Sequence, residues 1–200
     1  MNVVLEFPRA VTRRAETVAT LTAAFEDDAA VRTLYPEEAD YVRYFPGFLH
    51  ALGGRAFDLG AVDRDAAGQG AALWLPPGVE PDGEALADFL EASIPPDRLG
   101  PIAAGMAIQG RLHPAEPHWY LPWIGVLPEV QGCGFGARLL RQGLARADAQ
   151  GMPCYLEATN RRNAMLYARH GFEIIGVVEA PGYPEIIAMW RTGLHQPFSG

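Results

Sequence analysis

The sequence contains no lysine, only two cysteines and no long uninterrupted run of apolar residues. Cys133 and Cys154 are too few for a disulfide framework or a cysteine zinc site, so we expect a reduced, cytoplasmic setting. A membrane-spanning helix needs roughly 20 consecutive apolar residues, and their absence argues against a membrane partner. The first residues lack the basic region and the following apolar region of a secretory signal, so we expect no such signal.

Positive charge is also scarce, because the formal net charge is −8 and every basic residue is an arginine. An acidic chain argues against non-specific binding of nucleic acid, which depends on clustered cations. The charges are nevertheless spread unevenly. Residues 131–171 contain six arginines against two acidic residues, a net charge of +4. Each arginine alone is typical of a solvated helix face, but the whole window indicates a place for an anionic ligand.

Hydrophobic periodicity, together with the positions of glycine and proline, predicts alternating helices and strands. We expect strands over residues 56–62, 69–75, 118–126, 154–158, 172–178 and 185–190. We expect helices over residues 14–28, 37–52 (kinked or split at Pro46), 82–93, 97–111 and 163–170, and one that follows a glycine-rich loop and ends at about residue 150. This order predicts an α/β domain with a mixed sheet. A chain of 200 residues fits one domain, here residues 1–195, followed by a frayed tail over residues 196–200.

A glycine-rich loop, "QGCGFG" at residues 131–136, precedes the predicted helix that ends at about residue 150. Unpaired amides at a helix start attract phosphate, and glycines let a bulky anion approach them. A nucleotide-triphosphate loop requires a lysine, which this chain lacks. A dinucleotide loop is matched formally, with Glu157 as its ribose-binding acid, but the loop lies too far from the preceding strand end for the tight turn of that motif. Only 43 residues follow Glu157, too few for the rest of a doubly wound sheet.

A third scheme resembles a known family. The pattern Val126-x-Pro128-x-x-Gln131-Gly132-x-Gly134-x-Gly136-x-x-Leu139-Leu140 resembles the acyl-coenzyme-A loop of the GNAT N-acetyltransferases. The pattern Asn163-x-x-x-Tyr167-x-x-x-Gly171-Phe172 resembles the second half of the same family's motif. Longer stretches resemble the puromycin N-acetyltransferase-like members of that family: "AALWLPPG" (71–78), "EPHWYLPWIGVLPEVQGCGFG" (116–136) and "CYLEATNRRNAMLYARHGFEIIGVVEAP" (154–181).

The resemblance implies a GNAT fold, with a mixed sheet of about six to seven strands that splays between the fourth and fifth strands. Here those strands end near Val126 and Glu157. The resemblance also implies acetyl-CoA as the acetyl donor, with its diphosphate on the loop amides and an amide near Val126 polarising the thioester carbonyl. The implied donor-binding residues are Val126, Leu127, Gln131, Gly132, Cys133, Gly134, Phe135, Gly136, Ala137 and Asn163.

Two side chains fit the chemistry that the resemblance implies. Glu157 is a carboxylate in an apolar strand and a candidate general base, acting directly or through water; alternatively it faces outward or pairs with an arginine. Tyr167 is the implied proton donor to the departing sulfur; alternatively it packs one face of a short helix. Asn163 is either a donor contact or a helix N-cap.

The acceptor side is less defined by the sequence. Trp74 and Tyr120 are weak candidates for the acceptor pocket, because large aromatic residues more often build a core. The five histidines are scattered without metal-ligand spacing, so we expect no metal.

The predicted activity is acetyl-CoA-dependent transfer to a primary amine of a small molecule, and the closest resemblance suggests an aminonucleoside-type antibiotic. The alternatives are a protein or peptide N-acetyltransferase and a non-catalytic acyl-CoA sensor.

Overall fold

The computed structural model describes residues 6–194, with side chains from residue 11 onward. The tail predicted over residues 196–200 lies outside the described residues. A mixed sheet of six strands forms the centre of the described part, in the order β1-β2-β3-β4-β6-β5. Of the neighbouring strands in this sheet, only β3 and β4 run parallel. The sequence-based prediction of an α/β fold with a mixed sheet is therefore confirmed. The strands are β1 (Val62–Arg64), β2 (Gly70–Leu75), β3 (Trp119–Val126), β4 (Cys154–Ala158), β5 (Glu173–Val178) and β6 (Ile186–Arg191).

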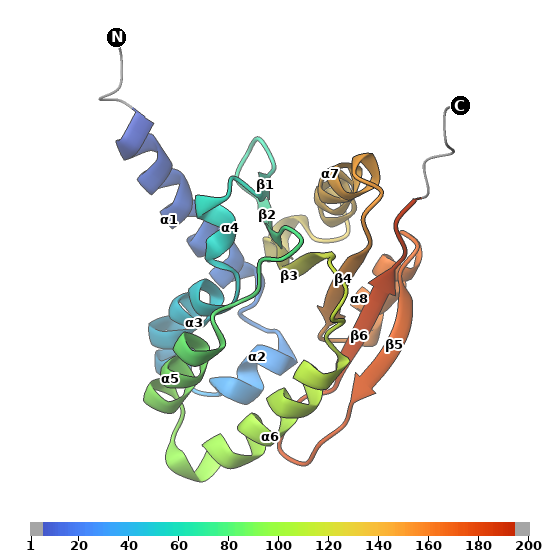
Figure 1. Cartoon of the computed structure of the whole chain (residues 1–200). Helices are drawn as coiled ribbons and strands as arrows, with labels where there is room; N and C mark the ends of the chain where they lie inside the picture. Colours follow the sequence, from blue (N-terminus) through green and yellow to red (C-terminus); the bar gives the residue numbers. More distant parts are fainter. Residues whose placement is uncertain (1–5, 195–200) are drawn as a thin grey trace.

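Helices cover both faces of this sheet, as Figure 1 shows. On one face lie α1 (Glu6–Ala24), α3 (Glu38–Gly53) and α5 (Gly83–Ser93), with α2 (Ala29–Leu34) and α4 (Arg55–Asp58) beside them and α6 (Pro96–Leu112) along the lower edge. On the other face lie α7 (Phe135–Ala149) and α8 (Arg161–Ala168), and a short 3₁₀ turn, η1 (Pro128–Val130), precedes α7. Across residues 6–194, no helix is long and apolar enough to cross a membrane.

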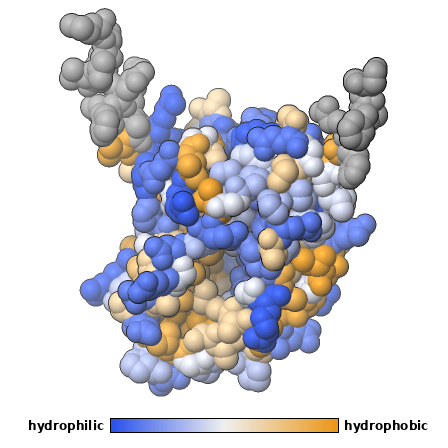
Figure 2. All heavy atoms as spheres, viewed as in Figure 1, coloured by the Kyte–Doolittle hydropathy of each residue, from blue (hydrophilic) through white to orange (hydrophobic). Residues whose placement is uncertain are grey.

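The alternation of side chains along β4 divides the core into two layers. Tyr155 belongs to the layer under α1 and α3, whereas Cys154 and Leu156 belong to the layer under α7, as successive strand residues face opposite sides of a sheet. A glycine lets α7 pack closely against the Trp74 ring of β2, because a Cβ at Gly143 of α7 would lie 2.1 Å from that ring. The face shown in Figure 2 is largely hydrophilic, with apolar side chains over the edge strand β5 and toward its lower end.

One expected strand is wrong, one short helix was not expected, and Pro46 does not split its helix. The segment predicted as a strand over residues 56–62 is mostly helical, and only Val62–Arg64 forms a strand. The six-residue helix α2 was not expected; Asp28 begins it by accepting hydrogen bonds from the amides of Ala30 and Val31. Pro46 lies inside α3 without ending the helix. The carbonyl that loses its helical partner because of Pro46 belongs to Val42, which is an exposed residue.

Candidate functional site

Strands β3 and β4 separate at their carboxyl ends. They pair at only three positions, the last of which joins Leu121 to Leu156. Beyond that point β3 continues to Val126, still paired with β2 on its other edge. Pro122 lies at a register shift between β2 and β3, where a residue that cannot donate to the ladder is tolerated. A bulge of this kind bends its strand, so a wedge opens between the ends of β3 and β4.

This wedge is the splay that the resemblance implies, at the two strands expected to form it. Counted along the described chain, it separates the third and fourth strands rather than the fourth and fifth, because the first described element is the helix α1.

The loop between β3 and α7 carries the glycines that prompted the sequence-based prediction. Gly132 and Gly134 have φ angles of +77° and +83°, a region that residues with a Cβ rarely adopt. A Cβ at either position would meet nothing within 4 Å, so the backbone there is open to its surroundings. Gly134 is the N-cap of α7, and no side chain caps this helix start.

The amides at this helix start have no partner within the described protein. The amide of Arg138 donates to the Gly134 carbonyl at 3.1 Å, which is the first hydrogen bond of the helix. Over residues 6–194, no hydrogen bond is found for the backbone N–H groups of Gly132, Gly134, Phe135, Gly136 and Ala137. Unpaired amides at a helix N-terminus carry partial positive charge, so this loop offers a cluster of donors to an anion.

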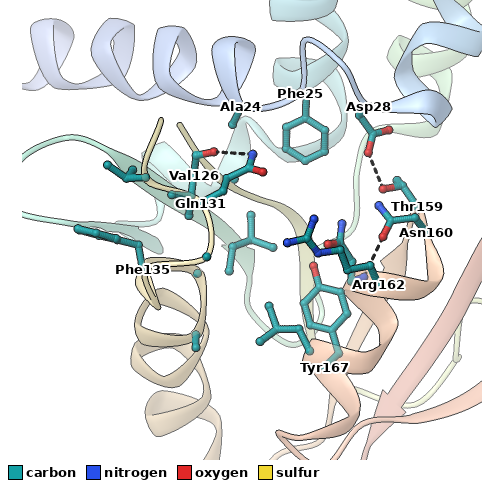
Figure 3. Close-up of a pocket in the computed structure, with 18 of the residues that line it drawn as sticks. Ala24, Phe25, Asp28, Val126, Gln131, Phe135, Thr159, Asn160, Arg162 and Tyr167 are labelled. Atoms are coloured by element: carbon teal, nitrogen blue, oxygen red, sulfur yellow. Dashed lines mark hydrogen bonds between the residues drawn. The ribbon is translucent and has the colours of Figure 1, made fainter. Parts of the chain in front are cut away.

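A cavity of about 740 Å³ opens in front of these amides. Its walls are the loop, the last residues of β3, the α1–α2 turn and α8 (Figure 3). Leu127 and Cys133 are absent from this lining, although Cys133 lies in the loop itself. The other donor-binding candidates from the sequence all line the cavity, together with Tyr167: Val126, Gln131, Gly132, Gly134, Phe135, Gly136, Ala137 and Asn163.

Charge around the cavity favours an anion at one end. Arg162 and Arg169 line it, and within the described part of the chain neither forms an ion pair. Asp28 lies on the opposite wall, but its carboxylate is engaged: Oδ1 caps α2, and Oδ2 accepts the Thr159 hydroxyl at 2.6 Å. Asp27 also lines the cavity and forms no ion pair among the described residues, so the uncommitted positive charge belongs to the wall that carries Arg162 and Arg169. This wall lies in the window where the sequence indicated an anionic ligand.

Tyr167 and Asn163 lie on the same side of α8 and line the same cavity. The Tyr167 hydroxyl points into the cavity (Figure 3) and has no hydrogen-bond partner among the described residues. Burial raises the pKa of Tyr167 above its usual value, with a smaller contribution from Asp28, so the hydroxyl stays protonated at neutral pH. Asn163 is not the N-cap: Asn160 caps α8 by accepting the Asn163 amide at 2.8 Å. This leaves the Asn163 side chain available to the cavity.

Glu157 lies on the opposite face of the sheet from Tyr167, because β4 turns alternate side chains to opposite faces. It does not line the cavity. Its Oε2 accepts the hydroxyl of Tyr120 at 2.7 Å, and its Oε1 accepts the hydroxyl of Tyr155 at 3.0 Å. Burial, and to a smaller extent the charge of Glu157, raises the pKa of both tyrosines. Both hydroxyls therefore stay protonated and donate hydrogen bonds to Glu157. Glu157 forms no ion pair with an arginine within the described chain. This excludes the alternative that Glu157 is the buried partner of an arginine.

The two acceptor-side candidates have different surroundings. Trp74 is fully buried beneath α7, in contact range of Gly143 and 6.5 Å from the Trp119 ring. That position gives Trp74 a packing role. Tyr120 instead contacts Glu157 directly, on the face covered by α6. Reasoning from the sequence missed the wall formed by Phe25, Asp28 and Thr159, because nothing local to those residues signals that the α1–α2 turn meets the end of β4.

The chain is similar to known acetyltransferases. Residues 99–174 match the acetyltransferase (GNAT) domain family. A solved structure from Corynebacterium glutamicum ATCC 13032, described as histone acetyltransferase HPA2 and related acetyltransferase, is 31% identical over 94% of each chain, with a TM-score of 0.61. Arylalkylamine N-acetyltransferase 2 from Aedes aegypti shares the fold, at 12% identity and a TM-score of 0.61 over 91% of this chain and 95% of that one.

A curated relative, an uncharacterized N-acetyltransferase of Schizosaccharomyces pombe, is 35% identical over 54 residues, which are 27% of this chain and only 22% of that protein. The splayed sheet and these similarities define an α/β acyltransferase. More specifically, the chain belongs to the GNAT acetyltransferase family, whose members use acetyl-CoA as the acetyl donor.

Proposed function

We propose that this acetyltransferase transfers the acetyl group of acetyl-CoA directly to the neutral primary amine of a small molecule. Both substrates are bound together, and the enzyme forms no covalent intermediate. The observation that carries the proposal is the set of five unpaired amides, from Gly132 to Ala137, facing a cavity of about 740 Å³. A helix start of this kind suits a diphosphate without any lysine.

The residues around the cavity fit the donor substrate. The open backbone at Gly132 and Gly134 leaves room for phosphate oxygens, and Arg162 and Arg169 supply positive charge that no carboxylate of the described residues neutralises. When bound, acetyl-CoA supplies the acetyl group as an activated thioester. The exposed edge of β3 up to Val126 would hold the chain that carries the thioester, and an unpaired amide there would polarise its carbonyl.

Tyr167 is proposed as the proton donor to the departing thiolate. Its hydroxyl lies at the cavity wall without a competing partner among the described residues, and its raised pKa keeps the proton on the oxygen until it is needed. Asn163, four residues earlier on the same helix face, is proposed to contact the donor beside it.

Glu157 is proposed as the general base. Two tyrosine hydroxyls hold its carboxylate in one orientation, and each carboxylate oxygen retains a further lone pair for a proton or a water molecule. The wedge opens where the pairing of β3 and β4 ends at Leu121 and Leu156, and in this proposal the two substrates meet there. An acceptor amine approaching from the Glu157 side could therefore give up its proton while the opposite side receives the sulfur.

A small acceptor is favoured over a peptide by the closure of the Glu157 face. Tyr183, in the β5–β6 connection, donates its hydroxyl to Gln109 of α6, and a Cβ at Gly105 would clash with its ring. The connection is thus packed onto α6, and we propose that this contact excludes an extended chain from the Glu157 face. The alternative is acetylation of a protein lysine, and the relative from C. glutamicum described as a histone acetyltransferase favours testing it.

A thiol-release assay with acetyl-CoA and a panel of amines tests the proposal. The panel contains an aminonucleoside antibiotic, suggested by the resemblance of three sequence stretches, an arylalkylamine, a polyamine and a lysine-containing peptide. We expect saturable thiol release with at least one small amine and little with the peptide. Thiol release with the peptide but with none of the small amines would establish the alternative, acetylation of a protein lysine. Donor binding without release by any amine would favour the acyl-CoA sensor.

A further inference from the structure

Three side chains outside the proposed acetyl-transfer machinery converge on the Glu157 face of the sheet. Glu80 follows β2, His113 caps the end of α6, and His118 immediately precedes β3. One ligand atom from each of these residues lies within 4.8 Å of the other two. The two imidazole rings are 5.0 Å apart, centroid to centroid. Spacing along the sequence did not group these residues; the chain reversal between α6 and β3 brings them together.

The imidazole of His118 is held in one orientation and one tautomer. Its Nδ1 lies 2.7 Å from the carbonyl oxygen of Glu116. A carbonyl only accepts hydrogen bonds, so Nδ1 carries the proton and Nε2 carries a lone pair. His118 is only 4% exposed, and its Nε2 has no hydrogen-bond partner among the described residues. Metal-binding histidines usually have this arrangement, in which one ring nitrogen donates to a carbonyl and the other faces the ion.

The second imidazole and the carboxylate have a separation suited to a shared ion. Nε2 of His113 lies 3.2 Å from Oε2 of Glu80, yet it forms no hydrogen bond with correct geometry. In a tetrahedral zinc site, with metal–ligand bonds of about 2.0–2.2 Å, neighbouring ligand atoms lie roughly 3.3 Å apart. The His113–Glu80 distance matches that value. The other pairs of ligand atoms lie at most 4.8 Å apart, and small side-chain rotations would bring them to the same distance.

We propose that Glu80, His113 and His118 form a binding site for a divalent transition-metal ion, with Zn²⁺ as the best match to two imidazoles and one carboxylate. Three protein ligands leave one position of a tetrahedral ion open to solvent, on the side of Glu80, whose side chain is 58% exposed. The ion would link Glu80, which follows β2, to the two histidines at either end of the short connection between α6 and β3, beside the face proposed for the acceptor.

The surroundings support this proposal in two ways. Pro114 and Pro117 stiffen the short connection between the two histidines, and Tyr155 packs against both rings at centroid distances of 4.6 and 5.6 Å. The site is thus organised before any ion arrives.

Direct metal titration of the full-length, untagged protein tests the proposal. After treatment with a chelator and its removal, Zn²⁺ is titrated in competition with a chromophoric chelator, and Co²⁺ serves as a spectroscopic probe. The variants are Glu80→Gln, whose exposed position should not affect folding, and His118→Gln. The matched control is His170→Gln, because His170 also places Nδ1 near a backbone carbonyl, that of Leu166 at 2.9 Å, but belongs to no such cluster among the described residues.

We expect one equivalent of Zn²⁺ to bind, and visible Co²⁺ bands of the intensity typical of tetrahedral coordination. Removing a group that only hydrogen-bonds to a metal ligand costs about 10–100-fold in metal affinity, so loss of a ligand in Glu80→Gln should cost at least that much. His118→Gln should also lose the Co²⁺ bands, whereas the control should match the parent protein. Absence of saturable binding, or unchanged affinity in Glu80→Gln, would overturn the proposal. Neither result depends on acetyl transfer.

Discussion

At the residue scale, Glu157 and Tyr167 have opposite hydrogen-bonding environments. Glu157 accepts two tyrosine hydroxyls, whereas the Tyr167 hydroxyl has no partner among residues 6–194 and faces the cavity. A carboxylate held by donors suits a proton acceptor with fixed geometry, and a neutral, unengaged phenol suits a proton donor. These environments fit the roles that the family resemblance implies for both residues.

Replacing the proposed base should reduce turnover without affecting donor binding. In Glu157→Gln, the amide cannot take up the amine proton, so we expect kcat to fall by roughly 10²–10⁴-fold. The affinity for acetyl-CoA should be unchanged, because Glu157 does not line the cavity. Steady-state kinetics and calorimetry measure the two effects. Tyr155→Phe is the control, since it removes one hydrogen bond and retains the carboxylate; full turnover in Glu157→Gln would refute the assignment.

Tyr167→Phe tests the proposed acid separately. Only the hydroxyl is removed, and the buried ring keeps its packing against Phe172 at 6.1 Å. We expect a loss of turnover of about 10²–10⁴-fold and an unchanged melting temperature. The loss should shrink with donors that release a less basic thiol, because such a leaving group needs no proton. A uniform loss with every donor would instead indicate that Tyr167 only positions the donor.

The two cysteines should differ sharply in reactivity. Cys133 is exposed in the glycine loop, whereas Cys154 is fully buried, and burial raises the pKa of the Cys154 thiol to about 12. Because the thiolate is the reactive form, a thiol reagent should modify one cysteine in the native protein and both after unfolding. Acetyl-CoA should slow modification of Cys133 if the donor covers the loop. Equal labelling with and without acetyl-CoA would contradict a donor at that position.

At the scale of elements, α7 joins the site to the core. Its first turn presents the free amides, and its buried face packs on Trp74 through Gly143. Glycine within a helix costs about 1 kcal/mol relative to alanine. The closeness of the Trp74 ring explains why glycine is nevertheless required there.

Gly143→Ala should therefore destabilise the protein, even though alanine favours helices. The new Cβ would lie 2.1 Å from the rigid Trp74 ring, and overpacking of this kind costs about 1–3 kcal/mol. Gly136→Ala is the matched change in the same helix, because its Cβ would make an ordinary contact of 3.7 Å with Val126. Chemical denaturation should show a lower free energy of unfolding for Gly143→Ala only. Equal stability of the two variants would disprove this packing account.

Sequence patterns predicted the helices and strands that have strong local signals, and they failed where tertiary contacts determine the secondary structure. Residues 154–158 were predicted as the strand that the structure has, because an apolar run follows Gly151 and Pro153. Residues 56–62 looked like a strand, but Ala56 is fully buried in a helical turn that continues the path of α3. The helix α2 is only six residues long, too short for a periodic signal, and its one local cue was the capping Asp28.

At the scale of the whole molecule, the site combines segments that the sequence could place only in part. The glycine loop and the 163–172 pattern were visible as motifs, since their residues are close together along the chain. The wall at Asp28 and Thr159 was not, because it depends on how the α1–α2 turn packs against the end of β4. Likewise, only the fold reveals that Glu157 and Tyr167 face opposite sides of the sheet.

The central claim is that the bare amides before α7 bind the diphosphate of the donor. Isothermal titration calorimetry comparing acetyl-CoA with acetyl-pantetheine, which has the thioester but no diphosphate, tests this claim most directly. The account predicts saturable one-to-one binding of acetyl-CoA and at least about 100-fold weaker binding of acetyl-pantetheine, or roughly 2.7 kcal/mol. Equal affinity for the two compounds, or no heat with acetyl-CoA, would contradict it.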